Sequence, residues 1–232
     1  MDRVDAPAKL TLSLRVVGVR PDGYHLIDAE MVTLDLADQL EIGPGDSLEV
    51  VEAGSGAPVP TGEDNLVRRA LAASGRSAAV RLTKRIPAGA GLGGGSADAA
   101  AVLRWAGIDD LDVAASLGAD VPFCLVGGRA RVTGIGEVVD PLPVLPLTFT
   151  IVTPPFGCAT PAVYRMWDEM GGPSADGPND LEAAALAVEP KLAGWRDRLA
   201  EATGLVPVLA GSGSSWFVSG AHPEAGRVVH TA

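Results

Sequence analysis

The sequence has little of what proteins use to form covalent cross-links or to cross membranes. Its two cysteines among 232 residues, Cys124 and Cys158, stand far apart and lack metal-ligand spacing, which is typical of a reducing compartment. No apolar run approaches the ~20 residues of a membrane-spanning helix. The N-terminal residues are charged and lack the apolar core of a signal peptide. These absences predict a soluble, cytoplasmic protein.

Aromatic and basic residues are also scarce. Aromatic side chains make up 4% of the chain, the formal net charge is -11, and lysine occurs only at Lys9, Lys84 and Lys191. Contact with nucleic acid or an anionic membrane requires a basic surface, so the composition argues against both partners. A small anionic molecule is compatible with it, because a few local donors or a metal ion can supply the positive field.

Alternating and periodic patterns predict a mixed α and β protein. Strands are expected at 10–17, 31–42, 47–52, 78–86, 123–126, 129–133, 137–139, 149–153, 206–210 and 216–218. The segment 31–42 is expected to contain a short turn. Helices are expected at 66–71, 96–106, 111–117, 161–170, 180–187 and 191–203. Loops rich in glycine or proline are expected at 53–62 and at 141–146, where the chain would pass between two lobes.

The most distinctive segment is Arg85–Ala101, with the sequence R-I-P-A-G-A-G-L-G-G-G-S-A-D-A-A-A. Five glycines fall within positions 89–95, after a strand pattern and before an alanine-rich helical pattern. Glycine adopts positive φ without strain and lets a ligand approach the backbone closely. The start of the helix near Ser96 adds free amides and the positive end of the helix dipole. The segment predicts the phosphate-binding loop of a nucleotide-using enzyme.

Two common glycine-rich nucleotide motifs do not fit this loop. A match to G-x-G-x-x-G falls at Gly89, Gly91 and Gly94. A dinucleotide-binding fold places a continuously apolar parallel strand before that motif, whereas the strand here is amphipathic and carries Lys84 and Arg85. A P-loop ends in G-K-[ST], and this loop ends in G-G-G-S-A-D. A Rossmann oxidoreductase is therefore the weakest alternative.

Five segments in a fixed order resemble the GHMP small-molecule kinases. They are P-A-K-L at 7–10, D-G-Y-H at 22–25, the glycine-rich segment at 87–100, L-G-A-D-V-P-F at 117–123 and A-G-S-G-S-S at 210–215. Each is weak alone, because a lysine opening a strand is usually a solvated charge and an aspartate before V-P is usually a turn former. Their order spans nearly the whole chain, which argues against coincidence.

The resemblance implies an α+β protein with the two-lobed GHMP kinase fold. Residues 1–140 would form an N-terminal domain similar to domain 2 of ribosomal protein S5, with the ATP loop. Residues 141–232 would form a shortened, ferredoxin-like αβ-plait domain. Segments 23–26, 65–67, 118–122 and 133–137 are most similar to the member that uses ATP and Mg²⁺ to phosphorylate a hydroxyl of 4-diphosphocytidyl-2-C-methyl-D-erythritol in the non-mevalonate isoprenoid pathway.

The resemblance also implies roles for individual residues. Asp120 would accept the proton of the attacking hydroxyl, and Lys9 would keep that carboxylate ionised and stabilise developing negative charge. The substrate-binding positions are Thr11, Tyr24, His25 and Tyr164, of which Tyr164 would stack on the cytosine ring. Ser96 would bind Mg²⁺ or a phosphate. The ATP-binding positions are Asn65, Lys84, Pro87, Ala88, Gly89, Ala90, Gly91, Leu92, Gly93, Gly94, Gly95, Ser96 and Ala97.

The chain departs from the family pattern in two places. Asparagine usually follows P-A-K-L, whereas Thr11 stands here and has no amide donor for the substrate. Little chain follows 216–218, so a C-terminal helix is expected to be reduced or absent.

Two alternatives stay open. One is a GHMP kinase for mevalonate, homoserine or a sugar, which would have no use for a ring that stacks on a base. The other is a nucleotide-binding homologue with weakened turnover, against which the retention of Lys9 and Asp120 argues.

Overall fold

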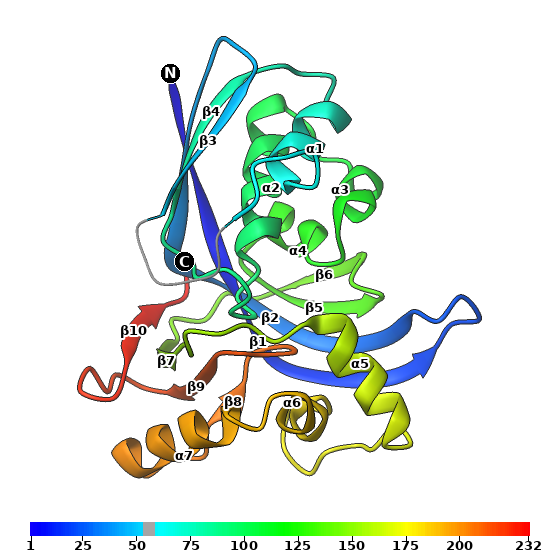
Figure 1. The fold of residues 1–232 in the computed structure, drawn as a ribbon, viewed down its shortest axis with the longest axis vertical. Helices are drawn as coiled ribbons and strands as arrows, with labels where there is room; N and C mark the ends of the chain where they lie inside the picture. The colour runs from blue at the N-terminus through cyan, green and yellow to red at the C-terminus, as the bar shows by residue number, and fades with distance from the viewer. Residues whose placement is uncertain (53–58) are drawn as a thin grey trace.

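The computed structural model describes residues 1–52 and 59–232, and its strands gather in two sheets (Figure 1). The loop expected at 53–62 lies largely outside the described residues. Among the described residues, no helix has the length and apolar character needed to cross a membrane.

The larger sheet is built around one long antiparallel hairpin. β1 (Asp2–Val19) and β2 (His25–Gly43) pair from Asp2 opposite Ile42 to Val19 opposite His25. The remaining order is β3–β4–β2–β5–β6, with β4 and β5 pairing with successive parts of β2. These strands are β3 (Ser47–Glu52), β4 (Ala79–Lys84), β5 (Arg129–Gly134) and β6 (Val138–Leu142). Lys9 therefore lies near the middle of a strand, with pairing on both sides of it in the sequence.

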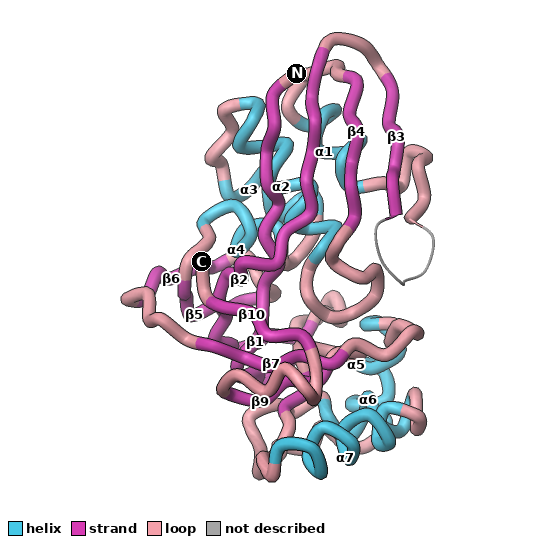
Figure 2. Tube along the Cα trace, turned by 90° about the vertical axis from the view of Figure 1, so that its left-hand side faces the viewer, coloured by secondary structure: helices cyan, strands magenta, loops and turns pink. Residues whose placement is uncertain are grey.

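Helices cover one face of this sheet (Figure 2). They are α1 (Leu66–Ala73), α2 (Gly94–Ala106), α3 (Leu111–Leu117) and α4 (Val121–Val126). In α2, every residue from Ala97 to Leu103 is buried, and four of these seven are alanines. Because alanine adds little bulk, α2 can pack closely among its neighbours on all sides. The helix that follows the glycine-rich loop is thus held inside the core.

The smaller sheet has the order β10–β7–β9–β8 and carries the last three helices. Its strands are β7 (Thr148–Val152), β8 (Val208–Leu209), β9 (Trp216–Ser219) and β10 (Arg227–His230), and its helices are α5 (Thr160–Glu169), α6 (Glu182–Val188) and α7 (Leu192–Thr203). The long hairpin also reaches this sheet region, through bridges from Leu14 to Asn179 and from Leu34 to Thr231.

Two local predictions are wrong, and one strand is not predicted at all. Residues 123–126 form part of helix α4 instead of a strand, since a short buried apolar run suits either element and Pro122 favours a helix start. No turn interrupts 31–42, because Ala37 and Asp38 stay paired with β1. The sequence also does not predict β10, whose four residues pair with β7. The predicted α5 and α7 are confirmed within two residues.

Asp180 ties β1 to the segment before α6. Its carboxylate is 2% exposed and accepts hydrogen bonds from Arg15 Nη1 at 2.7 Å, from the Val16 amide at 2.9 Å and from the Ala175 amide at 2.8 Å. Burial acts to raise the pKa of Asp180, but these hydrogen bonds outweigh it and hold the pKa below its ordinary value.

We expect Asp180→Asn to lower the free energy of unfolding by about 2 kcal/mol at pH 7, because the amide cannot replace a carboxylate that accepts three hydrogen bonds. Stabilisation from a lowered pKa is present above the unfolded value of 3.8 and is lost as pH falls through the lower folded value. The difference from wild type in urea unfolding should therefore shrink below pH 4. Asp176→Asn, an exposed carboxylate in the same segment, is the control. A difference that persists undiminished at pH 2 would contradict this account.

Candidate active site

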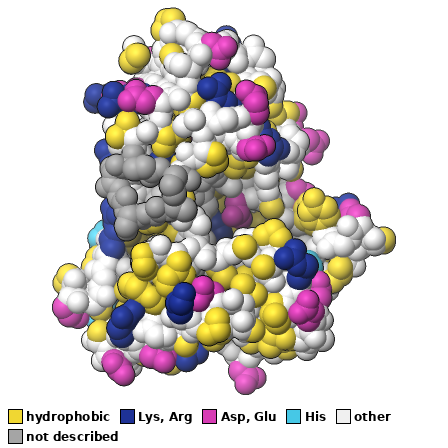
Figure 3. Space-filling view, viewed as in Figure 1, with side chains coloured by type: hydrophobic (Ala, Val, Ile, Leu, Met, Phe, Trp, Pro, Cys, Tyr) yellow, Lys and Arg dark blue, Asp and Glu magenta, His cyan; other side chains and the backbone are white. Residues whose placement is uncertain are grey.

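A cleft of about 840 Å³ is lined by residues of the larger sheet and its helices on one side, and by α5 and residues 211–212 on the other. Figure 3 shows the molecule hollowed between its upper and lower halves. The predicted site residues that line the cleft are Lys9, Thr11, Tyr24, His25, Asn65, Lys84, all of 87–96, Asp120 and Tyr164. Ala97 is not part of the lining. It is fully buried, and its amide donates to the Gly93 carbonyl within α2.

The glycine-rich loop is held from both sides of the cleft. The Lys9 amide donates to the Leu92 carbonyl at 3.0 Å, and the Ser215 amide donates to the Ala90 carbonyl at 3.0 Å. Gly91 has a φ of 79°, and a Cβ there would lie 2.4 Å from the Ala210 carbonyl oxygen. Only glycine fits such a close backbone approach at positive φ.

Helix α2 begins directly after this loop without a capping side chain. Its N-cap is Gly93, at a φ of 69°, and no side chain accepts a hydrogen bond from the first-turn amides. Those amides and the positive end of the helix dipole therefore favour an anion at this end of the cleft. Ser96, in the first turn, lines the cleft, and within the described residues its hydroxyl makes no hydrogen bond.

Lys9 and Asp120 meet at the cleft. Lys9 Nζ lies 3.3 Å from Asp120 Oδ2, and the lysine side chain is 6% exposed while the aspartate side chain is 34% exposed. Asp120 occupies the N-cap position of α4 but its side chain does not cap that helix, so the carboxylate is available to the cleft. The pair thus presents an accessible carboxylate supported by a buried ammonium group.

Thr11 orients the Lys9 ammonium group. Lys9 Nζ donates to Thr11 Oγ1 at 3.0 Å, and Thr11 is 1% exposed. The pairing of β1 with β2 shifts register between Pro7 and Lys9 and again between Thr11 and Ser13. Between these shifts the pairing is regular, so Lys9 and Thr11 point to the same face of β1. Thr11 therefore positions Lys9 through a direct hydrogen bond, a role that the sequence does not predict.

Aromatic side chains form one end of the cleft. The His25 ring lies 4.6 Å from the Tyr164 ring, centroid to centroid, with an interplanar angle of 36°. Tyr24, which precedes His25, is 59% exposed. Burial and the nearby Asp120 charge raise the pKa of Tyr164, which keeps its hydroxyl protonated. Three of the four predicted substrate residues, Tyr24, His25 and Tyr164, thus lie together at this end, from the β1–β2 hairpin and from α5.

Asp168 also lines this end of the cleft and Trp167 is buried behind it, although the sequence singles out neither residue. His25 Nε2 lies 2.8 Å from Asp168 Oδ1, and the His25 ring meets the edge of Trp167 at 5.7 Å between centroids. The available signal was helical spacing, because Asp168 follows Tyr164 by four residues and so lies on the same face of α5.

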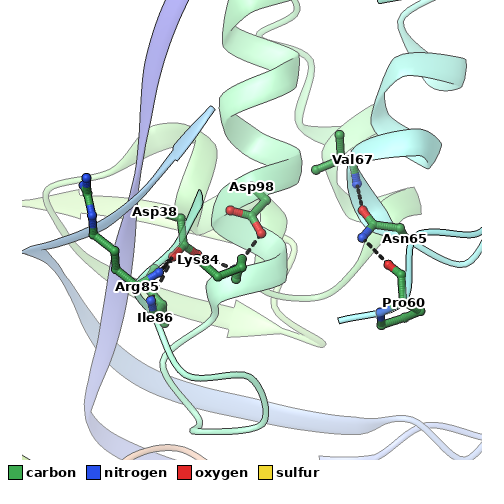
Figure 4. Close-up of polar contacts among 8 residues, drawn as sticks. All are labelled: Asp38, Pro60, Asn65, Val67, Lys84, Arg85, Ile86 and Asp98. Atoms are coloured by element: carbon green, nitrogen blue, oxygen red, sulfur yellow. Dashed lines mark hydrogen bonds and ion pairs between the residues drawn. The ribbon is translucent and has the colours of Figure 1, made fainter. Parts of the chain in front are cut away.

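Lys84 and Asn65 are both engaged in contacts within the protein (Figure 4). Lys84 forms ion pairs with Asp38 and Asp98, all three being buried. Burial alone would lower the pKa of Lys84, but the two carboxylates outweigh it and raise that pKa, while burial raises the pKa of Asp98. Asn65 caps α1 by accepting from the Val67 amide at 2.8 Å and donates to the Pro60 carbonyl at 2.7 Å.

Comparison with known proteins agrees with this architecture. A family model described as GHMP kinases N terminal domain matches residues 65–128, from the cap of α1 to just beyond α4. The fold, the glycine-rich loop and the cleft thus define a GHMP kinase, an ATP-dependent phosphotransferase. The chain is also 41% identical to the 4-diphosphocytidyl-2-C-methyl-D-erythritol kinase of Paracoccus denitrificans (strain Pd 1222), over 97% of this chain and 90% of the relative. The chain belongs to this family of 4-diphosphocytidyl-2-C-methyl-D-erythritol kinases.

Solved structures support the same placement. A crystal structure of a 4-(cytidine 5'-diphospho)-2C-methyl-D-erythritol kinase matches with a TM-score of 0.78 at 34% identity, and the match covers 100% of both chains. A homoserine kinase from Cytophaga hutchinsonii matches with a TM-score of 0.62 at 21% identity, covering 97% of this chain and 87% of that one. The second match shows a shared fold alone.

Proposed function

We propose that this protein transfers the γ-phosphoryl group of ATP to a hydroxyl of 4-diphosphocytidyl-2-C-methyl-D-erythritol. The observation that carries the proposal is the Lys9–Asp120 pair, which stands in one cleft with the anion-binding loop and the aromatic end. A hydroxyl of a substrate held at the aromatic end would meet the γ-phosphate beside Asp120.

In this proposal Asp120 and Lys9 have different roles in phosphoryl transfer. Phosphoryl transfer requires little covalent help and mostly requires positioning and charge neutralisation. Asp120, whose carboxylate reaches the cleft, accepts the proton of the attacking hydroxyl. Lys9 donates to Thr11 and faces Asp120, and its positive charge keeps the Asp120 carboxylate ionised. Because an ammonium group has three protons, one is left to donate to a phosphoryl oxygen. In this scheme Thr11 contributes to substrate binding indirectly, by orienting Lys9.

ATP would bind along the glycine-rich segment 87–97, with the free backbone amides between residues 89 and 96, at the start of α2, toward the phosphates. Asn65 and Lys84 would shape the nucleotide side of the cleft, because both line it while their polar groups are bound to the protein. Mg²⁺ fits Ser96, whose hydroxyl oxygen lines the cleft and is unengaged among the described residues. Bound there with the phosphates, the ion would neutralise their charge, since Mg²⁺ is commonly held by few protein ligands plus substrate phosphates.

Tyr24, His25 and Tyr164 would bind the cytidine end of the substrate. The tyrosine rings offer stacking surfaces, and His25 is held in place by Asp168. We also propose a lobe boundary at residues 140/141, within the last part of β6 and before β7. We further propose activity in the cytoplasm, where the free thiols of Cys124 and Cys158 would stay reduced.

We expect Tyr164→Ala to raise the KM for the cytidyl substrate roughly 5- to 150-fold, because stacking on an aromatic ring contributes about 1–3 kcal/mol per base. The KM for ATP should stay within about twofold. ADP release in a coupled assay measures both constants, and Tyr164→Phe, which keeps the ring, is the matched control.

The same assay separates the alternatives. If Tyr164→Ala leaves the KM for the cytidyl substrate unchanged, the base-recognition proposal fails. Turnover of homoserine, mevalonate or a sugar in preference to the cytidyl alcohol would instead favour another GHMP kinase activity.

A further inference from the structure

Asp38 lies beneath the glycine-rich loop and is fully buried in the middle of β2. Its Oδ1 accepts hydrogen bonds from the backbone amides of Arg85 at 2.5 Å and Ile86 at 2.8 Å, the two residues that lead from β4 into the loop. Its Oδ2 accepts from Lys84 Nζ. One carboxylate therefore fixes three consecutive residues at the start of the loop (Figure 4).

Lys84 extends this connection to the other end of the loop. Its Nζ also donates to Asp98 Oδ2 at 2.7 Å, and Asp98 belongs to the second turn of α2. A Cβ at Gly94, the first residue of α2, would lie 3.2 Å from Lys84 Nζ. The ammonium group thus lies against the point where the loop becomes a helix. The strand before the loop and the helix after it are joined through a single side chain.

The charges of this group argue against direct phosphate binding by Lys84. Its ammonium group is 4% exposed and is paired with two carboxylates, so the three side chains together provide no positive field for an anion. Removing one partner from a buried ion pair is costly, because an uncompensated charge is left behind. Lys84 would have to leave both carboxylates to reach a phosphate. Its geometry suits support of the loop instead.

We infer that Asp38 is a positioning residue that, through Lys84 and the amides of Arg85 and Ile86, holds both ends of the glycine-rich loop in the shape that binds ATP. The inference rests on the proposed ATP-binding function of that loop. It deepens that proposal in two ways. Asp38, which lies outside the cleft lining, controls the shape of the loop, and Lys84 supports the loop backbone instead of binding a phosphate.

The test compares wild type with Asp38→Asn, which keeps the shape of the side chain and removes its charge. ATP and CDP binding are measured by calorimetry, and amide hydrogen exchange is followed in peptides covering 85–96. We expect Asp38→Asn to weaken ATP binding at least tenfold and to speed exchange in 85–96, with CDP affinity within twofold of wild type. Asp35→Asn is the matched control, because Asp35 lies on the same strand and accepts a backbone amide, that of His230.

The outcomes separate this inference from the function on which it rests. If wild type binds no ATP, the proposed function fails. If wild type binds ATP and a folded Asp38→Asn binds it equally well with unchanged exchange, the inference is overturned. An equal loss of ATP and CDP binding would also overturn it, because that pattern indicates general destabilisation. Should Asp38→Asn not fold, Asp98→Asn is measured in its place, and there a two- to fivefold loss for ATP alone supports the inference while no loss overturns it.

Discussion

Asp120→Asn is expected to lower kcat by about 10²- to 10⁴-fold, the usual contribution of a positioned general base. The asparagine keeps the shape of the side chain but cannot accept the proton of the attacking hydroxyl. ATP affinity should stay within about twofold, because the glycine-rich loop is held by Lys9, Ser215 and the start of α2, and not by Asp120. Single-turnover kinetics and calorimetry measure the two quantities separately.

Controls for this prediction are available within the same chain. Asp112→Asn removes an exposed carboxylate from α3 and should leave kcat unchanged. Lys9→Met should also lower kcat, and the double variant should be little slower than the slower single variant, because residues that act as a unit are not additive. Equal rates for wild type and Asp120→Asn would remove Asp120 from the mechanism.

Gly91→Ala is expected to have the largest effect on nucleotide binding, with at least a 100-fold loss of ATP affinity. The new Cβ would lie 2.4 Å from the Ala210 carbonyl oxygen and 2.7 Å from that of Gly213, and both are backbone atoms that no change of rotamer can move. The loop must therefore shift away from the residues that hold it. The positive φ adds strain, and we expect the free energy of unfolding to fall by about 2–3 kcal/mol.

The variant Gly75→Ala distinguishes the effect of a steric clash from that of backbone strain at positive φ. Gly75 also has a positive φ, of 64°, but a Cβ there meets no atom within 4 Å. This control should cost about 1 kcal/mol in urea unfolding, from backbone strain alone, and should leave ATP affinity unchanged. If both variants lose ATP affinity to the same extent, close packing at Gly91 is not what shapes the loop.

The sequence predicts the parts of the site that depend on local chemistry. The glycine-rich loop and the helix after it can be located because glycine and alanine have strong local preferences. The convergence of Lys9, Asp120 and Tyr164 on one cleft follows from family resemblance and not from spacing, because nothing local indicates that β1, the start of α4 and α5 meet. The geometry of the cleft agrees with that expectation.

The remaining features depend on tertiary contacts that a single sequence does not reveal. Asp38 resembles a turn residue in A-D-Q, yet its burial in β2 is stabilised by Lys84 and by the amides of the two residues that follow β4. The helix at 121–126 is decided by packing, since four of its residues are buried. Thr11 stands where the resemblance places asparagine and accepts a hydrogen bond from Lys9; the two residues share a strand face, but only the structure shows that this face meets the cleft.

The long hairpin limits how the enzyme can move. β1 and β2 form the centre of the larger sheet, yet Leu14 and Leu34 of the same strands bridge to Asn179 and Thr231, and the amide of the last residue, Ala232, donates to the Thr33 carbonyl. Two lobes that share the same pair of strands cannot separate as independent rigid bodies about a flexible linker. Any wide opening of the cleft would therefore have to bend the hairpin or break these contacts. A polypeptide cut near residue 140 would lose both bridges, which makes the second lobe a poor candidate for an autonomous folding unit.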